Sequence, residues 1–332
     1  MNVLIVTPYA SFNGGVESVN AMLRSVLEAD GHNVSLLTAD DEGGARSVVR
    51  RLVGLPAVTS ARFRKLDPRD YDMVIANGEF AWGIDHPNVL CVFHGSYLGF
   101  RDHLRAHLSR RQYWSLSWHA FVQQRAAKGR KVVAVSGFLA EILKRQGIEV
   151  SRVIVNGIDT QQFRPVHDRA RSRYLFVGSY HRYGKGFDIL ESLARRGLPI
   201  DCVTNADPGV DLGYLGVVDR ERMPDVYRRY RLVIFPSRFE SVGLVPLEAM
   251  SCGTPVVMSN VGVGPELRCH LPAFVFDQSG ENVADDILRR IADIENDYDY
   301  YASAARRYVT ENHSWERFSS QWRECVRERI AC

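Results

Sequence analysis

PSRFESVGLVPLEAMSCGTPVV, residues 236–257, is the stretch that decides the fold of this chain. A short apolar run precedes it, and a loop containing Gly243 follows that run. A helix is predicted to begin at Pro246, because proline is favoured at the first helical position. Gly253 ends this helix, and Pro255 prevents its continuation. The stretch therefore predicts a strand, a loop and a helix in succession.

The start of this predicted helix is suited to bind an anion. The backbone N–H groups of Gly243, Leu244 and Val245 would point out of the helix, and a glycine before a helix N-terminus lets a diphosphate approach. Glu240 lies before the turn and Glu248 just inside the helix. Taken singly, Glu248 fits an acidic residue that caps the first turn, and Glu240 fits a surface loop carboxylate. Neither interpretation explains both carboxylates together with the glycine.

Outward from this stretch, short apolar runs alternate with helical patterns along the chain. The first set lies at residues 3–6, 34–37, 73–76, 90–93 and 132–135, and the second at 174–178, 200–203, 232–235, 255–258 and 273–276. The runs are largely apolar on both faces, as in parallel strands covered by helices on both sides. They predict an α/β protein with two doubly wound, Rossmann-like domains. Ligands bind such sheets beyond the carboxyl ends of the strands, so the two domains are expected to face a central cleft.

Composition narrows the class of protein. The 332 residues suffice for two domains, and a formal net charge of +3 is not that of a nucleic-acid-binding protein. Residues 44–131 carry 15 Lys and Arg against 6 Asp and Glu, which fits anionic ligands, an anionic membrane surface or a solvated basic face. The six cysteines lack metal-site spacing. No signal peptide or membrane span is recognised, so a cytoplasmic location is expected, and peripheral contact with the inner membrane face stays open.

Residues 236–257 resemble the retaining glycosyltransferases of family 4, which have the GT-B fold. The match is to the family's Glu-x(7)-Glu signature, here Glu240 to Glu248. The resemblance implies that Glu240 contacts the donor sugar and that Glu248 holds the ribose hydroxyls. It also implies that the backbone of Gly243, Leu244 and Val245, together with Ser241, binds the donor diphosphate.

Other family landmarks follow in order over nearly the whole chain. Val218 lies in YLGVVD, residues 214–219, which resembles the segment that meets the nucleobase. SWERF, residues 314–318, resembles the start of the family's last helix. The implied domains are an N-terminal acceptor-binding domain at 1–156, a linker at 157–172, a nucleotide-sugar-binding domain at 173–312 and a helix at 313–332 that returns to the first domain.

A second loop supplies the expected positive charge. GSYHRYGKG, residues 178–186, resembles the family's Gly-Arg-x(5)-Lys-Gly loop. Lys185 matches the lysine, whose ammonium neutralises the leaving diphosphate. The arginine position holds Ser179, a departure from the family, and Arg182 is a candidate to replace that arginine. The alternative for Lys185 is a solvated loop lysine.

Two features of the first domain resemble family positions near the transferred sugar. Gly14 and Gly15 follow the first predicted strand, where glycines let the backbone approach a ligand closely. The alternative is a plain tight turn. His94 follows the fourth predicted strand and resembles the histidine that contacts the transferred sugar. A core or surface histidine is the competing interpretation.

Two further patterns allow more than one interpretation. Aromatic and basic residues interleave over residues 97–131, as in a helix that lies on an anionic bilayer, lines an acceptor site or packs its aromatics into the core. Asp297-Tyr298-Asp299 spells the Asp-x-Asp of metal-dependent transferases, but it lies in a polar helical stretch and is interpreted as a solvated helix face. We therefore expect neither a metal site nor a cofactor.

The predicted activity is transfer of a sugar, with retention of configuration and without a metal, from a nucleoside diphosphate sugar to a hydroxyl acceptor. Such a reaction serves the biosynthesis of glycans, glycolipids or glycosylated metabolites. A front-face attack is favoured, with Glu240 as nucleophile the alternative. Two other functions stay open: a nucleotide-sugar epimerase of the same fold, and a non-catalytic GT-B binding protein, which the departure at Ser179 favours.

Overall fold

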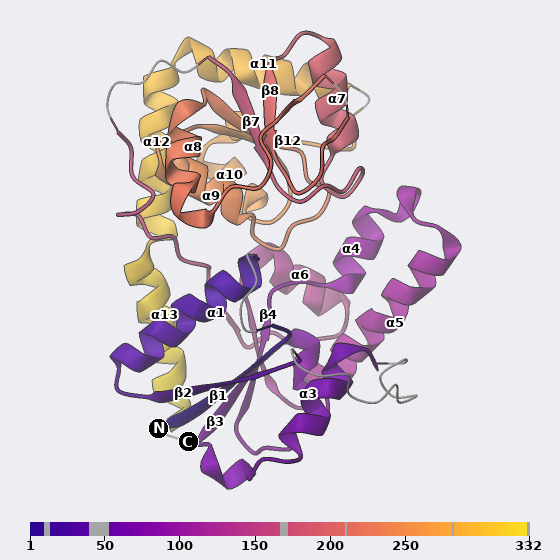
Figure 1. Ribbon diagram of the computed structural model, residues 1–332, viewed down its shortest axis with the longest axis vertical. Coiled ribbons are helices and arrows are strands. Elements are labelled where there is room, and N and C mark those ends of the chain that lie inside the picture. The colour runs from indigo at the N-terminus through magenta and orange to yellow at the C-terminus, as the bar shows by residue number, and fades with distance from the viewer. Residues whose placement is uncertain (10–13, 40–52, 167–171, 210, 281, 331–332) are drawn as a thin grey trace. The chain divides into compact units, whose positions relative to one another are not determined.

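The computed structural model describes residues 1–9, 14–39, 53–166, 172–209, 211–280 and 282–330. This part of the chain forms two units, residues 1–156 together with 318–332, and residues 157–317. Each unit is built on a parallel sheet flanked by helices (Figure 1). The predicted α/β class and the two doubly wound sheets are thus confirmed.

The first unit contains, among the described residues, a sheet with the strand order β2-β1-β3-β4-β5-β6. Its strands are β1 (Asn2–Thr7), β2 (Asn33–Thr38), β3 (Met73–Asn77), β4 (Val89–Phe93), β5 (Lys131–Ala134) and β6 (Arg152–Val153). Its helices are α1 (Gly15–Ala29), α3 (Leu55–Phe63), α4 (Tyr97–His103), α5 (Arg110–Ala127) and α6 (Gly137–Arg145), with 3-10 turns η1 (Pro68–Asp70), η2 (Gly78–Ala81) and η3 (Arg105–His107). The chain moves from β1 outward to β2 and then returns to β3 on the other side of β1. Loops that follow strands on either side of such a reversal leave a crevice for a ligand.

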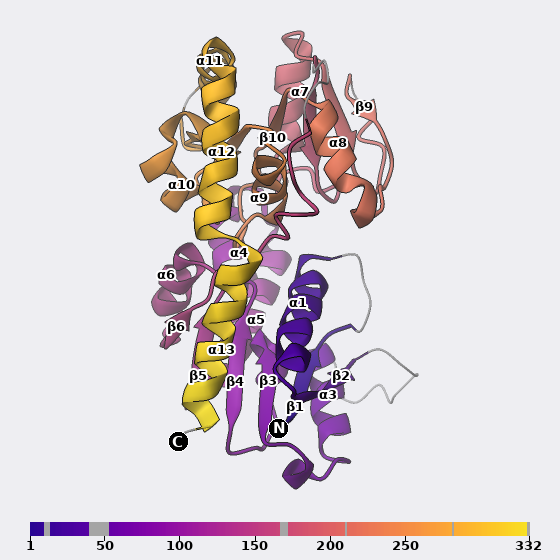
Figure 2. The same cartoon turned by 90° about the vertical axis from the view of Figure 1, so that its left-hand side faces the viewer.

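Helix α13 (Trp315–Ile330) joins the first unit from the far end of the chain. Phe318, Trp322 and Val326 recur every four residues and are almost fully buried. The Arg323 guanidinium forms an ion pair with Asp30, at the end of α1, with a separation of 2.9 Å. Figure 2 shows α13 running beside β4 and β5. An apolar face at helical spacing therefore holds this helix to the first sheet.

The second unit repeats the plan, with the described strands in the order β12-β11-β10-β7-β8-β9. These strands are β7 (Tyr174–Val177), β8 (Ile200–Val203), β9 (Gly213–Tyr214), β10 (Leu232–Phe235), β11 (Val256–Ser259) and β12 (Val275–Phe276). The helices are α7 (Phe187–Arg195), α8 (Met223–Arg229), α9 (Leu244–Ser251), α10 (Gly264–His270), α11 (Val283–Asn296) and α12 (Tyr298–Asn312), with η4 (Arg220–Arg222) and η5 (Pro272–Phe274). The strand order reverses between β7 and β10, so the loops after these two strands border the crevice of this sheet.

All ten predicted strands are present, and the structure adds β6 and β9. Each added strand is two residues long and lies at an edge of its sheet. Within their own bounds, Arg152–Val153 and Gly213–Tyr214, neither is an apolar run of the kind by which a buried strand is identified.

The described part of the predicted linker, residues 157–166, packs within the second unit. Phe163 is 1% exposed. Its carbonyl oxygen accepts hydrogen bonds from Ser251 Oγ at 2.6 Å and from the Arg306 guanidinium at 2.8 Å. Residues 167–171 of the predicted linker lie outside the described residues, as do residues 331–332 of the predicted last segment.

Candidate functional site

The turn before α9 has the backbone shape of an anion-binding helix start, although the helix begins earlier than predicted. Gly243 is the N-cap, with φ 90° and ψ 74°, and α9 begins at Leu244 rather than at Pro246. A proline in the third position is tolerated because the first N–H groups of a helix have no acceptor within it. For the same reason, the N–H groups of Leu244 and Val245 have no intrahelical partner. Gly253, with φ 70°, follows the last turn as predicted.

A glycine brings the loop after β7 against the loop after β10. Gly186 has φ 74°, and a Cβ atom there would lie 2.2 Å from the carbonyl oxygen of Pro236. No other residue type allows this approach without displacing the backbone. As a result, the ammonium of Lys185 forms an ion pair with the carboxylate of Glu240, with side chains 27% and 19% exposed. The structure thus brings two predicted site residues, 55 positions apart, into direct contact beside the start of α9.

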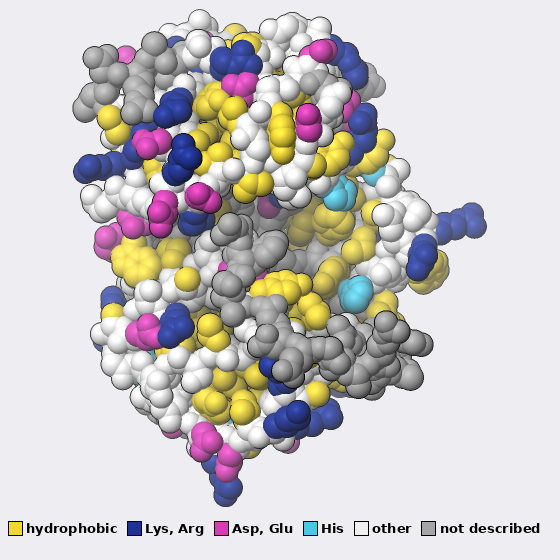
Figure 3. Space-filling view, viewed as in Figure 1, with side chains coloured by type: hydrophobic (Ala, Val, Ile, Leu, Met, Phe, Trp, Pro, Cys, Tyr) yellow, Lys and Arg dark blue, Asp and Glu magenta, His cyan; other side chains and the backbone are white. Residues whose placement is uncertain are grey.

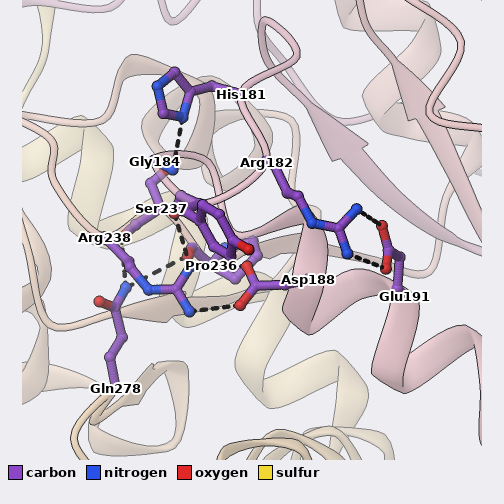
Figure 4. A network of polar contacts seen from close by, with 10 residues as sticks. His181, Arg182, Gly184, Asp188, Glu191, Pro236, Ser237, Arg238 and Gln278 are labelled. Carbon is purple, nitrogen blue, oxygen red and sulfur yellow. Dashed lines mark hydrogen bonds and ion pairs between the residues drawn. The ribbon is translucent and has the colours of Figure 1, made fainter. Parts of the chain in front are cut away.

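Arg182 has a different partner from the predicted one. Its guanidinium donates two hydrogen bonds of 3.0 Å to the carboxylate of Glu191 on α7. The Glu191 side chain is only 4% exposed, so this ion pair compensates a buried negative charge. Figure 4 shows the Arg182 side chain extended toward Glu191. Arg182 therefore supports α7, and a role at the phosphates stays a prediction.

Arg238 and Asp188, which no sequence pattern had indicated as site residues, tie the two loops together. The Arg238 guanidinium donates bonds of 2.8 and 2.7 Å to the two carboxylate oxygens of Asp188, in the first turn of α7 (Figure 4). Its backbone N–H donates to the carbonyl of Gly184 at 2.9 Å. Gln278 supports the same loop through a 2.6 Å bond from Nε2 to the Ser237 carbonyl. Arg238 lies inside the family-like stretch, but its partner 50 residues away has no signal in the sequence.

Glu248 lies on α9 with its carboxylate buried. It is the fifth residue of the helix, so the interpretation as a first-turn cap is wrong. Tyr227 donates a 2.9 Å hydrogen bond to Oε2, and Arg220 Nη2 lies 3.0 Å from Oε1. Burial raises the pKa of the Glu248 carboxyl, while Arg220 and the Tyr227 bond act in the opposite direction. Arg220 is 44% exposed, and its guanidinium also lies over the ring of Phe163, 5.8 Å from the ring centroid.

The segment predicted to meet the nucleobase exposes apolar side chains. Leu215 and Val217 are 45% and 67% exposed, and Tyr214 is 44% exposed. They precede Val218, which is partly buried, and the chain then reaches Arg220 beside Glu248. These exposed apolar side chains lie close in sequence to Arg220, which pairs with Glu248. Apolar side chains of this kind suit packing against the flat face of a nucleobase.

In the first unit, His94 lies at the end of β4 and takes part in a polar network. Its Nε2 lies 3.2 Å from Oδ1 of Asn77, the last residue of β3. Asn77 donates in turn to Thr7 Oγ1 at 3.0 Å and to Asn20 Oδ1 at 3.2 Å. Burial lowers the pKa of His94 to about 4. The imidazole is therefore neutral at pH 7 and held where β1, β3 and β4 end.

A carboxylate that no sequence pattern indicated is hydrogen-bonded to Tyr97, three residues after His94. Glu79, in η2, accepts hydrogen bonds from the Tyr97 hydroxyl at 3.1 Å and from Gln123 Nε2 at 3.0 Å. Gln123 also accepts from the Tyr97 N–H at 3.1 Å and donates to the Gly95 carbonyl at 3.4 Å. Gln123 thus clamps the segment that carries His94. Only the general position of Glu79, directly after a strand, was visible in the sequence.

Gly14 and Gly15 stand at the start of α1. Gly14 is the N-cap, with φ −106° and ψ 164°, and its carbonyl accepts a 3.0 Å bond from Ser18 Oγ. Neither glycine has a positive φ. Asn13, which precedes them, lies outside the described residues. Their contact with a ligand stays a prediction.

The aromatic and basic stretch at 97–131 is divided between core and surface. Tyr97 turns inward to Glu79, and Tyr113 packs beneath the guanidinium of Arg101, 4.8 Å from the ring centroid. Trp114, Trp118 and Phe121 are 71%, 44% and 48% exposed. Lys and Arg side chains stand out on the α4 and α5 side of the first unit (Figure 3). Among the described helices, none has the length and apolarity needed to cross a membrane.

Asp297 and Asp299 are exposed, but they do not share one helix. Asp297 is the N-cap of α12, and Asp299 belongs to the first turn of that helix. Helix α11 ends at Asn296, and both side chains are exposed at the start of α12, as expected of a solvated helix face. Within the described ranges, no group of three His, Cys, Asp or Glu residues is arranged to hold a metal ion.

Comparison with known families assigns both units. The model described as Glycosyltransferase Family 4 matches residues 13–162, and the model described as Glycosyl transferases group 1 matches residues 201–312. The chain belongs to glycosyltransferase family 4. The resemblance drawn from the Glu240 to Glu248 signature is therefore confirmed. Both family models together span most of the chain, in the order of the two units.

A curated relative of this family 4 chain matches part of its length. The lipopolysaccharide core biosynthesis mannosyltransferase LpsB of Rhizobium meliloti is 32% identical over 168 residues, which are 41% of this chain and 47% of the relative. The chain thus spans about half the length of that relative.

Solved structures of the GT-B type match the whole family 4 chain. Sucrose-phosphate synthase from Thermosynechococcus elongatus has a TM-score of 0.79 at 18% identity, with 99% of each chain covered. Anabaena HepE in complex with UDP-glucose has a TM-score of 0.72 at 16% identity, covering 99% of this chain and 100% of HepE. These likenesses confirm the predicted GT-B fold.

Proposed function

We propose that the protein is a retaining glycosyltransferase that moves a sugar from a nucleoside diphosphate sugar to a hydroxyl acceptor. The observation that carries the proposal is the Lys185–Glu240 contact beside the N-terminus of α9. A cation, a carboxylate and unpartnered backbone N–H groups at one turn match what a leaving diphosphate and a reacting sugar require. The second unit would bind the donor and the first unit the acceptor.

Each site residue has a distinct task in this reaction. The N–H groups of Leu244 and Val245 and the ammonium of Lys185 would stabilise the charge that develops on the diphosphate. Glu240 would contact hydroxyls of the donor sugar, and Glu248 would hold the ribose once Arg220 moves aside. The neutral imidazole of His94 would contact the transferred sugar from the first unit.

The proposed mechanism retains the configuration at the anomeric carbon by a front-face attack. The bond between the anomeric carbon and the diphosphate oxygen breaks, and the acceptor oxygen forms its bond to the same face of that carbon. The acceptor proton passes to the departing phosphate oxygen. Glu240 as a covalent nucleophile is the alternative.

A thermal-shift panel with UDP, GDP, ADP and dTDP tests donor binding, because a ligand that binds only the folded protein raises its melting temperature. Turnover of the matching nucleotide sugar with and without an acceptor then distinguishes three functions. Transfer to acceptor supports the proposal. Isomerised donor without acceptor identifies an epimerase, and binding without turnover identifies a non-catalytic protein.

Metal independence is part of the proposal. The positive charge that a divalent ion supplies in other transferases would come from Lys185 and the helix N-terminus. Transfer should be unchanged after exhaustive treatment with a chelator. Loss of activity that Mg²⁺ or Mn²⁺ restores would contradict this part of the proposal.

The relatives favour an acceptor in glycan biosynthesis. LpsB is named a lipopolysaccharide core mannosyltransferase, and another relative, from Escherichia coli, is named an O-antigen chain mannosyltransferase. We propose a glycan or a lipid-linked glycan as acceptor and a nucleotide sugar as donor. Extracts of lipid-linked and water-soluble glycans, offered separately with labelled donor, test this assignment.

A lipid-linked acceptor would place the enzyme at a membrane surface, and α5 carries side chains that suit contact with a bilayer. Trp114, Trp118 and Phe121, at spacing i, i+4 and i+7, lie on one face of the helix and are exposed. We name these three residues the α5 stripe and propose that it rests on the inner face of the cytoplasmic membrane. Flotation with vesicles should be lost in the Trp114→Ala/Trp118→Ala variant. Equal flotation of this variant and the unaltered protein would contradict the contact.

A further inference from the structure

A basic groove lies at the amino edge of the first sheet, away from the donor and acceptor residues. It encloses about 640 Å³. Its walls include Phe121, Arg125, Lys128, Lys131, Gly147 and Glu149. Lys131 opens β5, whereas His94 follows the carboxyl end of β4. Because these strands are parallel, the groove and His94 occupy opposite edges of the sheet. The proposed sugar transfer therefore makes no use of this groove.

Three cations of the groove have no partner among the residues that the structure describes. Arg125, Lys128 and Lys131 are exposed, and within the described residues their side chains form neither ion pairs nor hydrogen bonds. Glu149 is the one carboxylate among the residues that line the groove. Like charges on one concave surface repel one another over about 10 Å at moderate salt, so an anion that binds among them relieves this repulsion.

Arg130, in contrast, builds the wall of the groove. Its guanidinium donates 2.7 Å bonds to the carbonyls of Ala126 and Ile84 and a further bond to the carbonyl of Ala81. Its positive charge stays beside the groove without a carboxylate partner in the described residues, which strengthens the attraction for an anion.

Glycines shape the floor of the groove. Gly147 ends α6 with φ 78°, and a Cβ atom there would lie 2.8 Å from the Gln124 amide nitrogen. Gly129 has φ 73° and lies between α5 and β5. Both turns adopt a conformation that other residues rarely take, and the short connections leave room for a group the size of a phosphate.

The groove is continuous with the α5 stripe. Phe121 belongs to both, and its ring centroid lies 5.5 Å from that of Trp118. A bilayer in contact with the stripe would therefore present its headgroups at the mouth of the groove. Exposed aromatics beside unpartnered cations complement an interface of acyl chains and phosphates.

We propose that this groove binds the phosphate headgroup of an anionic phospholipid while the α5 stripe rests on the bilayer. The inference rests on the proposed membrane contact and adds lipid selectivity to it. The stripe supplies attachment to any bilayer, and the groove supplies the preference for negatively charged lipid.

Vesicle flotation with matched variants tests the proposal. The probes are vesicles of phosphatidylcholine alone and of phosphatidylcholine mixed with phosphatidylglycerol, at one ionic strength. The groove variant is Lys128→Ala/Lys131→Ala. The control variant is Arg64→Ala/Lys65→Ala, which removes the same charge from exposed residues at the end of α3. Circular dichroism and the nucleotide thermal shift verify that both variants fold.

The unaltered protein is expected to prefer the anionic vesicles. The groove variant should lose roughly tenfold or more of its affinity for them, since each basic residue near an anionic surface contributes strongly to binding. The control should lose less than about threefold, and binding to phosphatidylcholine alone should be equal in all three proteins.

Several results would overturn the inference. Equal losses in the groove and control variants would indicate nonspecific charge, and equal binding of the unaltered protein to both vesicles would exclude a headgroup site. Saturable binding of inorganic phosphate without vesicles, lost in the groove variant, would assign the groove to a soluble anion. Absence of binding to either vesicle would refute the membrane contact as well, while leaving sugar transfer to a soluble acceptor unaffected.

Discussion

Replacing Glu240 by glutamine is expected to tighten the binding of a nucleoside diphosphate while it impairs sugar transfer. The Lys185 ammonium is paired with the Glu240 carboxylate. A diphosphate that approaches the start of α9 must compete with this carboxylate for the ammonium. The Glu240→Gln substitution removes the competing charge and preserves the size of the side chain.

The size of the effect follows from the exposure of the pair. Two unit charges 4 Å apart attract each other by roughly 4 kcal/mol at an effective dielectric constant of about 20. Solvent reaches both side chains, which are 27% and 19% exposed, and exposed ion pairs contribute about 0.2–1 kcal/mol. We therefore expect release of Lys185 to improve binding by about 1 kcal/mol, which is roughly fivefold in the dissociation constant.

Isothermal titration calorimetry with UDP and GDP, at one ionic strength, measures this change. Glu295→Gln is a matched control, because Glu295 pairs with Arg231 at 2.7 Å and both are about equally exposed, at 30% and 29%. Arg231 precedes β10 and Glu240 follows it, so the control pair lies at the opposite edge of the sheet. The affinity of the Glu295→Gln variant for UDP and GDP should therefore equal that of the unaltered protein.

A double-mutant cycle identifies the cause. Lys185→Ala should weaken diphosphate binding by about tenfold and lower transfer by on the order of 10². In that background, Glu240→Gln should no longer tighten binding, because the ammonium it would release is absent. Weaker or unchanged binding in Glu240→Gln alone, or the same improvement without Lys185, would refute the reasoning.

Three further predictions concern the supporting structure. In urea titrations, Gly186→Ala should lower the free energy of unfolding by at least about 1 kcal/mol more than Gly197→Ala. Both glycines have a positive φ, but only a Cβ atom at Gly186 would meet a backbone carbonyl. Equal losses in the two variants would contradict this. Burial lowers the pKa of His94 from 6.5 to about 4, so the unfolded chain binds the proton more tightly than the folded protein. The contribution of the neutral imidazole to the free energy of unfolding is complete above pH 6.5. It should fall as the pH drops toward 4, by up to about 1.4 kcal/mol per pH unit. His94→Asn should flatten this part of a plot of urea midpoint against pH, and an unchanged slope would refute the assignment. Gln123→Ala should lower transfer by on the order of tenfold with nucleotide affinity unchanged, whereas the exposed neighbour Gln124→Ala should have little effect; matching losses would exclude the clamp.

Much of the fold was readable from local pattern. Short apolar runs such as residues 73–76 and 232–235 are buried on both faces, and burial on both faces requires helices on either side of a parallel sheet. The two-residue strands β6 and β9 escaped because they carry no pattern of their own. Helix α9 begins at Leu244, two residues before the predicted Pro246, because Gly243 is the N-cap.

The site was partly readable for the same reason. Glu240, Glu248 and Lys185 stand in two family-like stretches whose residues follow one another along the chain. The two stretches do not indicate which residue each charged side chain pairs with in the folded protein. Arg182 pairs with Glu191 rather than standing free for a phosphate, and that choice depends on which loop comes near which helix.

By itself, then, the amino-acid order determined two doubly wound sheets and a glycine turn ahead of a helix, and it placed two carboxylates and a lysine in stretches that resemble those of family 4. These are properties of neighbouring residues, set by periodicity and backbone preference. Only the tertiary structure decided that Lys185 contacts Glu240, that Arg238 binds Asp188 and that three cations gather around one groove. Such contacts join loops many residues apart, because side-chain hydrogen bonds and ion pairs form between groups that the packing of strands and helices brings together.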